Sequence, residues 1–263
     1  MKLQLDMSDL YLYDEPLRPS TGIQSQLPIL YEEYKFNNEQ DVKDYLALIA
    51  LTGDYFDQVI AFEQQKADAG LFMADYSCNT IIDQCNSFIA DEENHYLKET
   101  FNNKIDKLDT LSLAKRDSYK LQNEQMVSEY IIPAYKNLAA ALKTLAGSGN
   151  NENGLCYFPE GKTYYEYLLA YNTGSSKTVK ELETMISNER VRVLQESSDL
   201  TTENPELWDL TSEASLIPTD PTTTLNRLKE AMLADFPAPP DTNFTVSYID
   251  DCVADYLAPA YYV

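Results

Sequence analysis

Apolar residues recur every three or four positions along most of this chain, which is the spacing of amphipathic α-helices. The clearest run covers residues 42–69, where the apolar positions are Val42, Tyr45, Leu46, Ile49, Phe56, Val59 and Ile60. Asn38 stands just before this run, and its side chain can accept hydrogen bonds from the free amides of a first helical turn. We therefore expect one helix from Asn38 to about residue 69, with a bend at Gly53 and an end at Gly70.

The same spacing predicts four further helices before residue 146, over residues 24–34, 78–90, 95–106 and 111–145. Pro133 falls inside the last of them. A proline there removes one backbone hydrogen bond and clashes with the carbonyl group four residues earlier. We expect a kink at this point rather than a break. The run GSGNNENG at 147–154 is the clearest loop signal in the chain.

Helical signals continue after this loop. The spacing predicts a helix over residues 163–171. Thr178 and Glu181 match the capping-box pattern, which opens a helix that reaches Leu194. Asp220 followed by a proline predicts another helix, to about residue 234.

The segment NFTVSYI at 243–249 alternates and is rich in branched and aromatic residues, so it is the best candidate for a strand. Together these patterns predict an all-α, mostly helical fold with a minor β element near 243–249. We expect a single helical domain over residues 1–263, with the 147–154 loop as a candidate sub-boundary.

The charge of the chain excludes several classes of partner. Its formal net charge is −23, so a phosphate backbone would be repelled and nucleic acid is not an expected partner. An anionic membrane surface is disfavoured for the same reason. No stretch is long and apolar enough for a membrane span, and the N-terminus is not an intact signal peptide. The acidity is typical of a soluble surface, or of a field that attracts cationic peptides.

Residues that commonly carry chemistry are sparse. The chain has a single histidine, His95, which lies in the acidic stretch DEENHYLKE, and we expect it to be a solvated surface residue at a helix start. Without a second histidine or a suitable cysteine it is not an expected metal ligand, and we predict no catalytic residue and no metal ligand. Cys78 and Cys85 would lie about 10 Å apart along one helix, too far for a disulfide, so we expect free buried thiols.

Tyrosines gather in two places. In GLCYFPEGKTYYEYLL at 154–169, two glycines bracket an aromatic turn, and tyrosines crowd the opening of the next helix. Tyrosine hydroxyl groups at such a position can donate to a carbonyl or carboxylate group, as binding pockets require, although core packing is the ordinary alternative. A second cluster closes the chain. The predicted substrate-binding residues are Tyr164, Tyr165, Tyr261 and Tyr262.

Four segments carry a resemblance to a known family: EPLRPSTGIQSQLP at 15–28, DVKDYLALI at 41–49, GLCYFPEGKTYYEYLLAYNTGSS at 154–176 and FPAPPDTNFTVSYIDDCVADYLAPAYY at 236–262. In this order they resemble the bacterial DUF885 family, whose members look like zinc metallopeptidases of the largely helical, carboxypeptidase-like kind. The resemblance implies the helical half of a gluzincin-like architecture.

In such proteins a His-Glu-x-x-Pro-Gly-His segment with further acidic ligands follows beyond the PA-Tyr-Tyr stretch, whereas this chain stops at Val263. The resemblance therefore implies an N-terminal part, inactive alone, that contributes one wall of a substrate cleft. Zinc is expected only in the C-terminal part. The implied partners are peptides and that C-terminal half, with an exported or cell-surface location, and residues 244–263 are expected to expose an apolar face.

Two other hypotheses remain open. The chain could be a non-catalytic helical binding module at the cell surface that recognises peptides or glycans. It could also be a metal-free acid hydrolase, which would need a carboxyl group with a raised pKa in a cleft.

Overall fold

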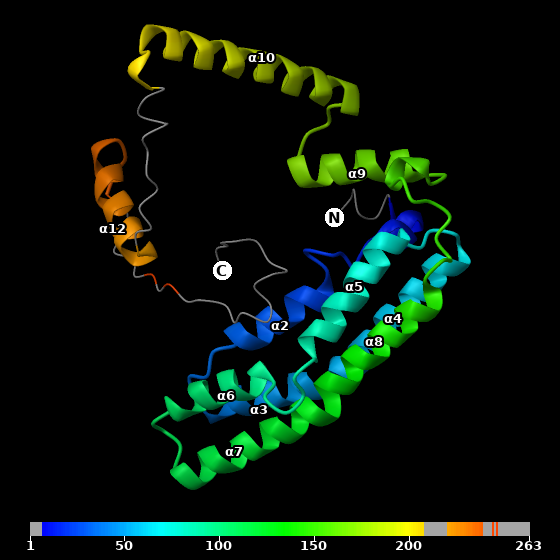
Figure 1. Ribbon diagram of the computed structural model, residues 1–263, viewed down its shortest axis with the longest axis vertical. Helices are drawn as coiled ribbons and strands as arrows, with labels where there is room; N and C mark the ends of the chain where they lie inside the picture. Colours follow the sequence, from blue (N-terminus) through cyan, green and yellow to red (C-terminus); the bar gives the residue numbers. More distant parts are fainter. Residues whose placement is uncertain (1–6, 208–219, 239–243, 245, 247–263) are drawn as a thin grey trace. The chain divides into compact units, whose positions relative to one another are not determined.

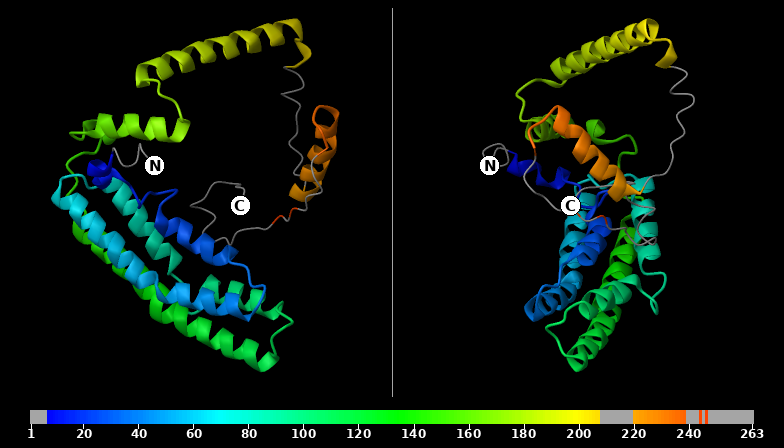
Figure 2. Two further views of the ribbon diagram at one scale, coloured as in Figure 1. Left: turned by 180° about the vertical axis from the view of Figure 1, so that it is seen from behind. Right: turned by 90° about the vertical axis from the view of Figure 1, so that its left-hand side faces the viewer.

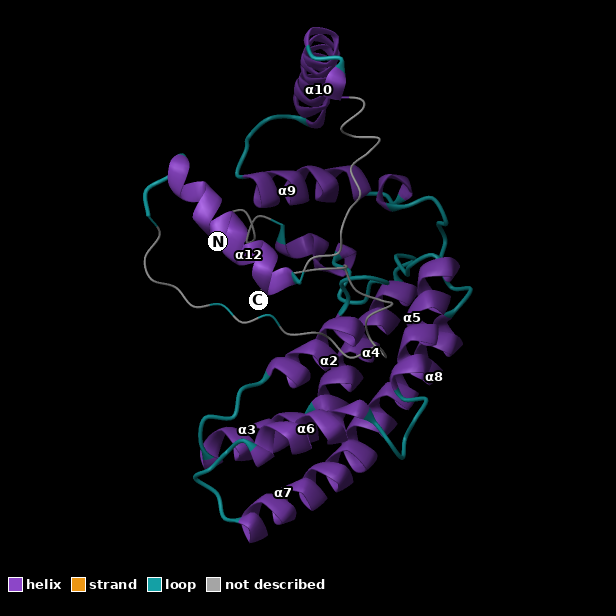
Figure 3. Cartoon of the chain, turned by 60° about the vertical axis from the view of Figure 1, so that its left-hand side comes forward, coloured by secondary structure: helices purple, strands orange, loops and turns teal. Residues whose placement is uncertain are grey.

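The structure, a computed structural model, describes residues 7–207, 220–238, 244 and 246. All regular elements of these residues are helical, and no strand occurs among them (Figures 1 and 3). The predicted all-α fold is confirmed. The predicted strand, 243–249, lies outside the described residues except for Phe244 and Val246, which have no regular secondary structure.

The described residues fall into two compact units, one ending at Gly174 and one beginning at Ser175. The first unit contains η1 (Ser8–Tyr13), α2 (Ile23–Glu33), α3 (Glu39–Ala50), α4 (Thr52–Asp68), α5 (Asp75–Phe88), α6 (Tyr96–Asp106), α7 (Leu113–Met126), η2 (Val127–Ile131), α8 (Ile132–Leu145), η3 (Leu155–Tyr157) and α9 (Gly161–Thr173). The second contains α10 (Val179–Glu203), α12 (Pro221–Ala231) and η4 (Met232–Ala234). The single domain over 1–263 and its sub-boundary at 147–154 stay predictions.

Three helical rods lie side by side in the first unit (Figures 1 and 2). The rod α3–α4 runs parallel to the rod α7–η2–α8, because α3 packs on α7 and α4 packs on α8. The remaining rod, α5–α6, runs in the opposite direction, because α5 packs on α8 and α6 packs on α7. Helix α2 packs on α5 and α6.

Local sequence explains where the first rod begins. The Asn38 side chain accepts hydrogen bonds from the amides of Gln40 and Asp41, and the Asp41 carboxylate accepts from the amide of Asn38. This reciprocal pair satisfies amides that no helical carbonyl group can reach. Gly70 follows the end of α4 with a φ of 72°, so the predicted start and end of this run are confirmed.

The single helix predicted for this run is wrong, because it breaks at Leu51 rather than bending at Gly53. Beside the break, the Thr52 hydroxyl group donates to the Ile49 carbonyl oxygen at 2.8 Å and lies 2.7 Å from the Tyr31 hydroxyl group. A carbonyl oxygen held by a side chain in this way favours a bend in the helix. Thr52 is 1% exposed, so the break is fixed by contact with α2.

Pro133 marks the joint of the third rod, where a kink is predicted. Five residues of π-helix, Val127–Ile131, separate α7 from α8, and the amide of Ile132 donates to the carbonyl oxygen of Val127. The wider π-turn accommodates a proline whose ring would clash with the carbonyl group of Glu129 in a regular α-helix. Ile131 and Val127 remain buried, so the joint keeps its apolar face on the core.

Aromatic rings fill the core of the first unit. Tyr135 and Phe56 are fully buried, and their ring centroids lie 4.9 Å apart. The Tyr135 hydroxyl group donates to the carbonyl oxygen of Gln24 at 2.9 Å and so joins α8 to α2. Burial raises the pKa of Tyr45 and Tyr135 well above that of an exposed tyrosine. Both hydroxyl groups therefore stay neutral.

In the second unit, α10 opens with the predicted capping box of Thr178 and Glu181, but it continues to Glu203. The Arg192 guanidinium group bridges Glu189 and Glu196 on its surface. Helix α12 is capped by Asp220, as predicted. No described residue of α10 or α12 is buried.

Candidate functional site

The segment around α9 carries the predicted tyrosine site. A turn of η3 precedes α9, and Gly161 begins the helix. A Cβ atom at Gly161 would lie 1.7 Å from the carbonyl oxygen of Leu155, a distance that no side chain tolerates. The glycine therefore lets η3 fold back against the first turn of α9, which explains its place in the aromatic segment.

Tyr164 is the anchor of α9. It is 7% exposed, and its ring centroid lies 5.5 Å from that of Tyr13 and 5.7 Å from that of Tyr167. The Tyr13 hydroxyl group accepts a hydrogen bond from the amide of Glu160 at 3.0 Å, at the start of the helix. Burial, followed by the charge of Asp14, raises the pKa of Tyr164 to about 12. Tyr164 thus joins α9 to the N-terminal segment, by which we mean residues 11–23.

Tyr165 lies next to this anchor but is 47% exposed. Tyr157 and Tyr171, at the two ends of the same segment, are also exposed. The structure therefore separates the two predicted residues of this region into a buried anchor and an exposed ring. Tyr261 and Tyr262 lie outside the described residues, so the predicted four-tyrosine site stays a prediction.

A buried ionic cluster lies beside this anchor. Lys66 of α4 is 0% exposed, and its ammonium group donates to the carbonyl oxygen of Asp14 at 2.7 Å and to the Glu15 carboxylate at 2.8 Å. Glu63, one helical turn earlier, is also 0% exposed. Neither of its carboxylate oxygens has a hydrogen-bond partner within the described part of the chain. We call Glu15, Glu63 and Lys66 the buried triad.

Burial dominates the electrostatics of the triad. It raises the pKa of Glu63 to about 7, although the charge of Lys66 opposes the rise. Burial also raises the pKa of Glu15, again against the attraction of Lys66. Glu63 has the raised pKa that an acid catalyst needs, but its side chain is not exposed and cannot touch a substrate in this state.

The buried triad is not among the residues predicted from the sequence, although the sequence carries a signal for part of it. Phe56 and Val59 belong to the apolar stripe of α4, and Glu63 and Lys66 continue that stripe at the same spacing. A charged pair on the apolar face of a helix indicates buried ionisable groups. The partner carboxylate, Glu15, lies far away in sequence and no local pattern identifies it.

His95 is not a solvated surface residue as predicted. It is 2% exposed, and its ring lies edge-on to Phe88 with centroids 4.8 Å apart and stacks on Tyr96. The Nδ1 atom accepts a hydrogen bond from the amide of Leu97, so His95 caps the start of α6. The acidic residues before His95 are exposed, which is why the sequence predicts an exposed histidine as well. The ring is instead buried against Phe88, a residue of another helix.

The structure also tests the prediction that Cys78 and Cys85 are free, buried thiols. Cys78 and Cys85 are free and buried, as expected, whereas Cys156 is free and exposed. Burial raises the pKa of Cys78 to about 11 and that of Cys85 to about 12, so both remain thiols. Cys252 lies outside the described residues.

A zinc centre needs three or more converging nitrogen, sulfur or carboxylate ligands. Within residues 7–207, 220–238, 244 and 246, no group of three or more histidine, cysteine or acidic side chains is placed to hold a metal ion. The described residues therefore do not fit a catalytic zinc ion. Any such ion would take its ligands from elsewhere in the protein.

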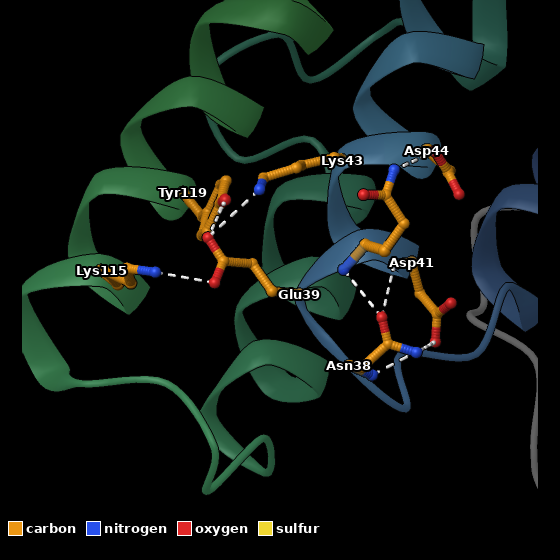
Figure 4. A network of polar contacts seen from close by, with 8 residues as sticks. Asn38, Glu39, Asp41, Lys43, Asp44, Lys115 and Tyr119 are labelled. Carbon is orange, nitrogen blue, oxygen red and sulfur yellow. Dashed lines mark hydrogen bonds and ion pairs between the residues drawn. The ribbon is translucent and has the colours of Figure 1, made fainter.

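A second polar network lies at the other end of the bundle and joins α3 to α7 (Figure 4). The Glu39 carboxylate accepts hydrogen bonds from Lys115 at 2.7 Å and from the Tyr119 hydroxyl group at 2.9 Å, and Lys43 lies 3.4 Å away. The hydrogen bonds from Lys115 and Tyr119 lower the pKa of Glu39 to about 2. The Glu39 carboxylate thus holds α3 to α7 through Lys115 and Tyr119.

The family model described as "Bacterial protein of unknown function (DUF885)" matches residues 1–262. The chain belongs to the DUF885 family. No curated protein matches it. Among solved structures, "the putative lipoprotein from Colwellia psychrerythraea" is similar, with a TM-score of 0.72 and 17% sequence identity. The match covers 83% of this chain and 39% of that one.

This similarity shows that the DUF885 chain shares its fold with part of a longer protein. The chain spans well under half the length of that structure. No helix in the described part of the DUF885 chain is long and apolar enough to cross a membrane.

Proposed function

We propose that this DUF885 chain is the substrate-binding helical region of a zinc-peptidase-like protein, in which it forms one wall of the substrate cleft. The catalytic metal and base would come from residues outside the described part. The observation that carries the proposal is the arrangement of α9, where an exposed Tyr165 stands beside the buried Tyr164. An exposed ring on a fixed helix offers apolar contact area and a hydroxyl group to a ligand.

The substrate class follows from the charge of the chain. With a net charge of −23, the surrounding field favours cationic peptides over anionic ones. The exposed rings of Tyr157 and Tyr171 would extend the contact along the same segment. Of the four tyrosines given above, Tyr165, Tyr261 and Tyr262 are proposed to contact substrate, and the buried Tyr164 is proposed to hold α9 in place for that contact.

A cell-surface location belongs to the same proposal. The similar structure is called a putative lipoprotein, and a lipid anchor holds a protein at a membrane surface. Peptides outside the cell would then reach α9 directly.

The test compares tyrosine variants in the full natural polypeptide supplied with zinc. Hydrolysis of a set of basic peptides should show a KM about tenfold higher for Tyr165→Ala, because one lost aromatic contact is worth about 1.4 kcal/mol. Tyr76→Ala is the control, since Tyr76 is also an exposed tyrosine on a helix of the first unit but lies on α5, at 68% exposure against 47% for Tyr165.

Three results would decide between the hypotheses. A raised KM for Tyr165→Ala alone would support the cleft wall. Peptide binding without hydrolysis, weakened by Tyr165→Ala, would instead favour a non-catalytic binding module at the cell surface. Absence of both hydrolysis and peptide binding would overturn the proposal.

A further inference from the structure

Lys66 holds the N-terminal segment to the helical core. Its ammonium group contacts two consecutive residues of that segment, the carbonyl oxygen of Asp14 and the carboxylate of Glu15. Glu15 begins the EPLRPSTG stretch, and its side chain is only 33% exposed. A single buried cation therefore fixes this part of the chain against α4.

Glu63 competes for the same cation. It lies three residues before Lys66 on α4, a spacing that places two side chains on one face of the helix. Its two carboxylate oxygens have no hydrogen-bond partner among the described residues, while Lys66 is engaged by Glu15. With Glu63 protonated the buried triad is neutral, and with Glu63 ionised it carries one uncompensated negative charge.

We propose that the buried triad is a proton-controlled latch on the N-terminal segment. Protonated Glu63 leaves Lys66 bound to Glu15 and the segment attached. Ionised Glu63 takes Lys66 as its partner, which frees Glu15 to move into water and releases the segment. The inference concerns a conformational device and does not depend on the proposed peptidase role.

The pKa of Glu63, raised to about 7, places this exchange of partners near neutral pH. A buried carboxylate that gains a negative charge must find a cation or water, because an unpaired charge in the interior costs several kcal/mol. Lys66 is the adjacent cation, since it lowers the pKa of both carboxyl groups.

Among the described residues, Lys66 is the cation whose charge acts on Glu63, and the nearby charges of Glu15 and Asp14 are negative. The N-terminal segment brings Asp14, which is exposed and paired with Arg18. Helix α5 brings the Cys78 thiol, which stays neutral, and the half-buried Asp75. The other charged residues on the helices around Glu63 do not neutralise it. Glu39 and Asp41 are bonded at the start of α3, and the rest are exposed: Asp9, Lys43, Asp44, Asp54, Asp57, Asp68, Asp83, Glu129, Lys136 and Lys143.

Release of the N-terminal segment would also affect α9, because Tyr13 contacts the start of that helix. Tyr13 precedes Asp14 and accepts the hydrogen bond from the amide of Glu160, and its ring supports Tyr164. A segment that leaves α4 withdraws this support from the first turn of α9. The latch therefore connects the protonation of Glu63 to the helix that carries the exposed tyrosines.

Amide hydrogen exchange of the full natural polypeptide between pH 6 and pH 8.5 tests the latch. The reporters are the amides of Asp14, Gly22 and Ile23, which donate to carbonyl oxygens of the same segment. After correction for intrinsic exchange, their protection should fall at least about tenfold as the pH rises, while the amides of α6 keep theirs.

Two variants separate the latch from general loosening. Glu63→Gln cannot ionise, so protection should stay at its pH 6 level at pH 8.5. Glu15→Gln lacks the anchoring charge, so protection should be low at both values. Asp57→Asn, at an exposed site on α4, should behave as the native protein does. Protection in the native protein that does not change with pH would overturn the proposal even if a variant failed to fold. An equal fall in Glu63→Gln would also overturn it.

Discussion

At the scale of single residues, two ionisable groups, Glu63 and Lys66, lie on the apolar stripe of α4, and only Lys66 has partners for its charge among the described residues. Lys66 has two oxygen acceptors, so its charge is compensated. Glu63 has no hydrogen bond in the described part of the chain, and it avoids the cost of burial by holding its proton. A group that is neutral when folded and charged when unfolded makes the stability of the protein depend on pH.

Glu63→Gln should remove this dependence. The folded protein holds the Glu63 proton up to about pH 7, whereas the unfolded chain releases it near its ordinary value of 4.5. Native stability should therefore fall as the pH rises from 4.5 to 7 and stay low above it. The variant lacks this loss, so at pH 8 its free energy of unfolding should be higher by about 1–3 kcal/mol. Urea unfolding at pH 4 and pH 8 measures the difference.

Glu39→Gln is the control with the opposite sign. The hydrogen bonds in Figure 4 lower the pKa of Glu39 to about 2, so its stabilising charge is fully present above about pH 4.5 and is lost as the pH falls toward 2. This variant should be less stable than the native protein at pH 7 and equal to it near pH 2. If both variants shifted stability in the same direction at neutral pH, the assignment of Glu63 would be wrong.

At the scale of helices, sequence was a good guide wherever local chemistry decides the outcome. Asn38, Thr178 and Asp220 cap helices as predicted, because a side-chain oxygen and a free amide two or three residues away suffice. The break at Leu51 was misplaced, because it depends on the contact of Thr52 with Tyr31 of another helix. No local pattern contains that contact.

The same distinction applies to the candidate site. Tyr164 and Tyr165 were identified together by composition, but only their opposite burial divides them into an anchor and an exposed ring. Glu63 and Lys66 could have been found from the apolar stripe that they interrupt. Glu15 and the burial of His95 could not, since each depends on a residue from a distant part of the chain or another helix.

Gly161→Ala should destabilise the start of α9. Its Cβ atom would overlap the carbonyl oxygen of Leu155, a backbone atom that can move only with the whole η3 turn. We expect a cost of about 1–3 kcal/mol, as for overpacking in a core. Thermal unfolding monitored by circular dichroism, together with exchange of the Tyr164 amide, measures it.

Gly53→Ala is the matched control for this substitution. Gly53 lies in α4 with nothing within 4 Å of the added Cβ atom, so the variant should gain about 0.5–1 kcal/mol from the lower entropy of its unfolded chain. Equal effects of the two substitutions would contradict a specific contact between Gly161 and Leu155.

At the scale of the whole molecule, burial is distributed unevenly along the chain. Every buried residue in the described part lies at or before Tyr164. Helices α10 and α12 nevertheless carry large exposed apolar side chains, such as Ile186, Val193 and Leu228. An isolated helix is marginally stable even with good caps, since most helical stability in proteins comes from packing. Phe244 is exposed as well, while the rest of the predicted apolar face at 244–263 lies outside the described residues.

Limited trypsin digestion of the intact chain should therefore cut α10 well before α7. Arg190 of α10 and Lys115 of α7 are both exposed and helical, so they differ chiefly in what lies beneath the helix. Cleavage needs local unfolding, and α7 can unfold only by giving up its contacts with α3 and α6. We expect cleavage after Arg190 at least about tenfold faster, with a resistant fragment that retains the helices before Gly174. Mass spectrometry of a time course identifies both products. Equal rates at the two sites would mean that α10 is packed in solution against a surface that protects it, and that its apolar side chains are not free.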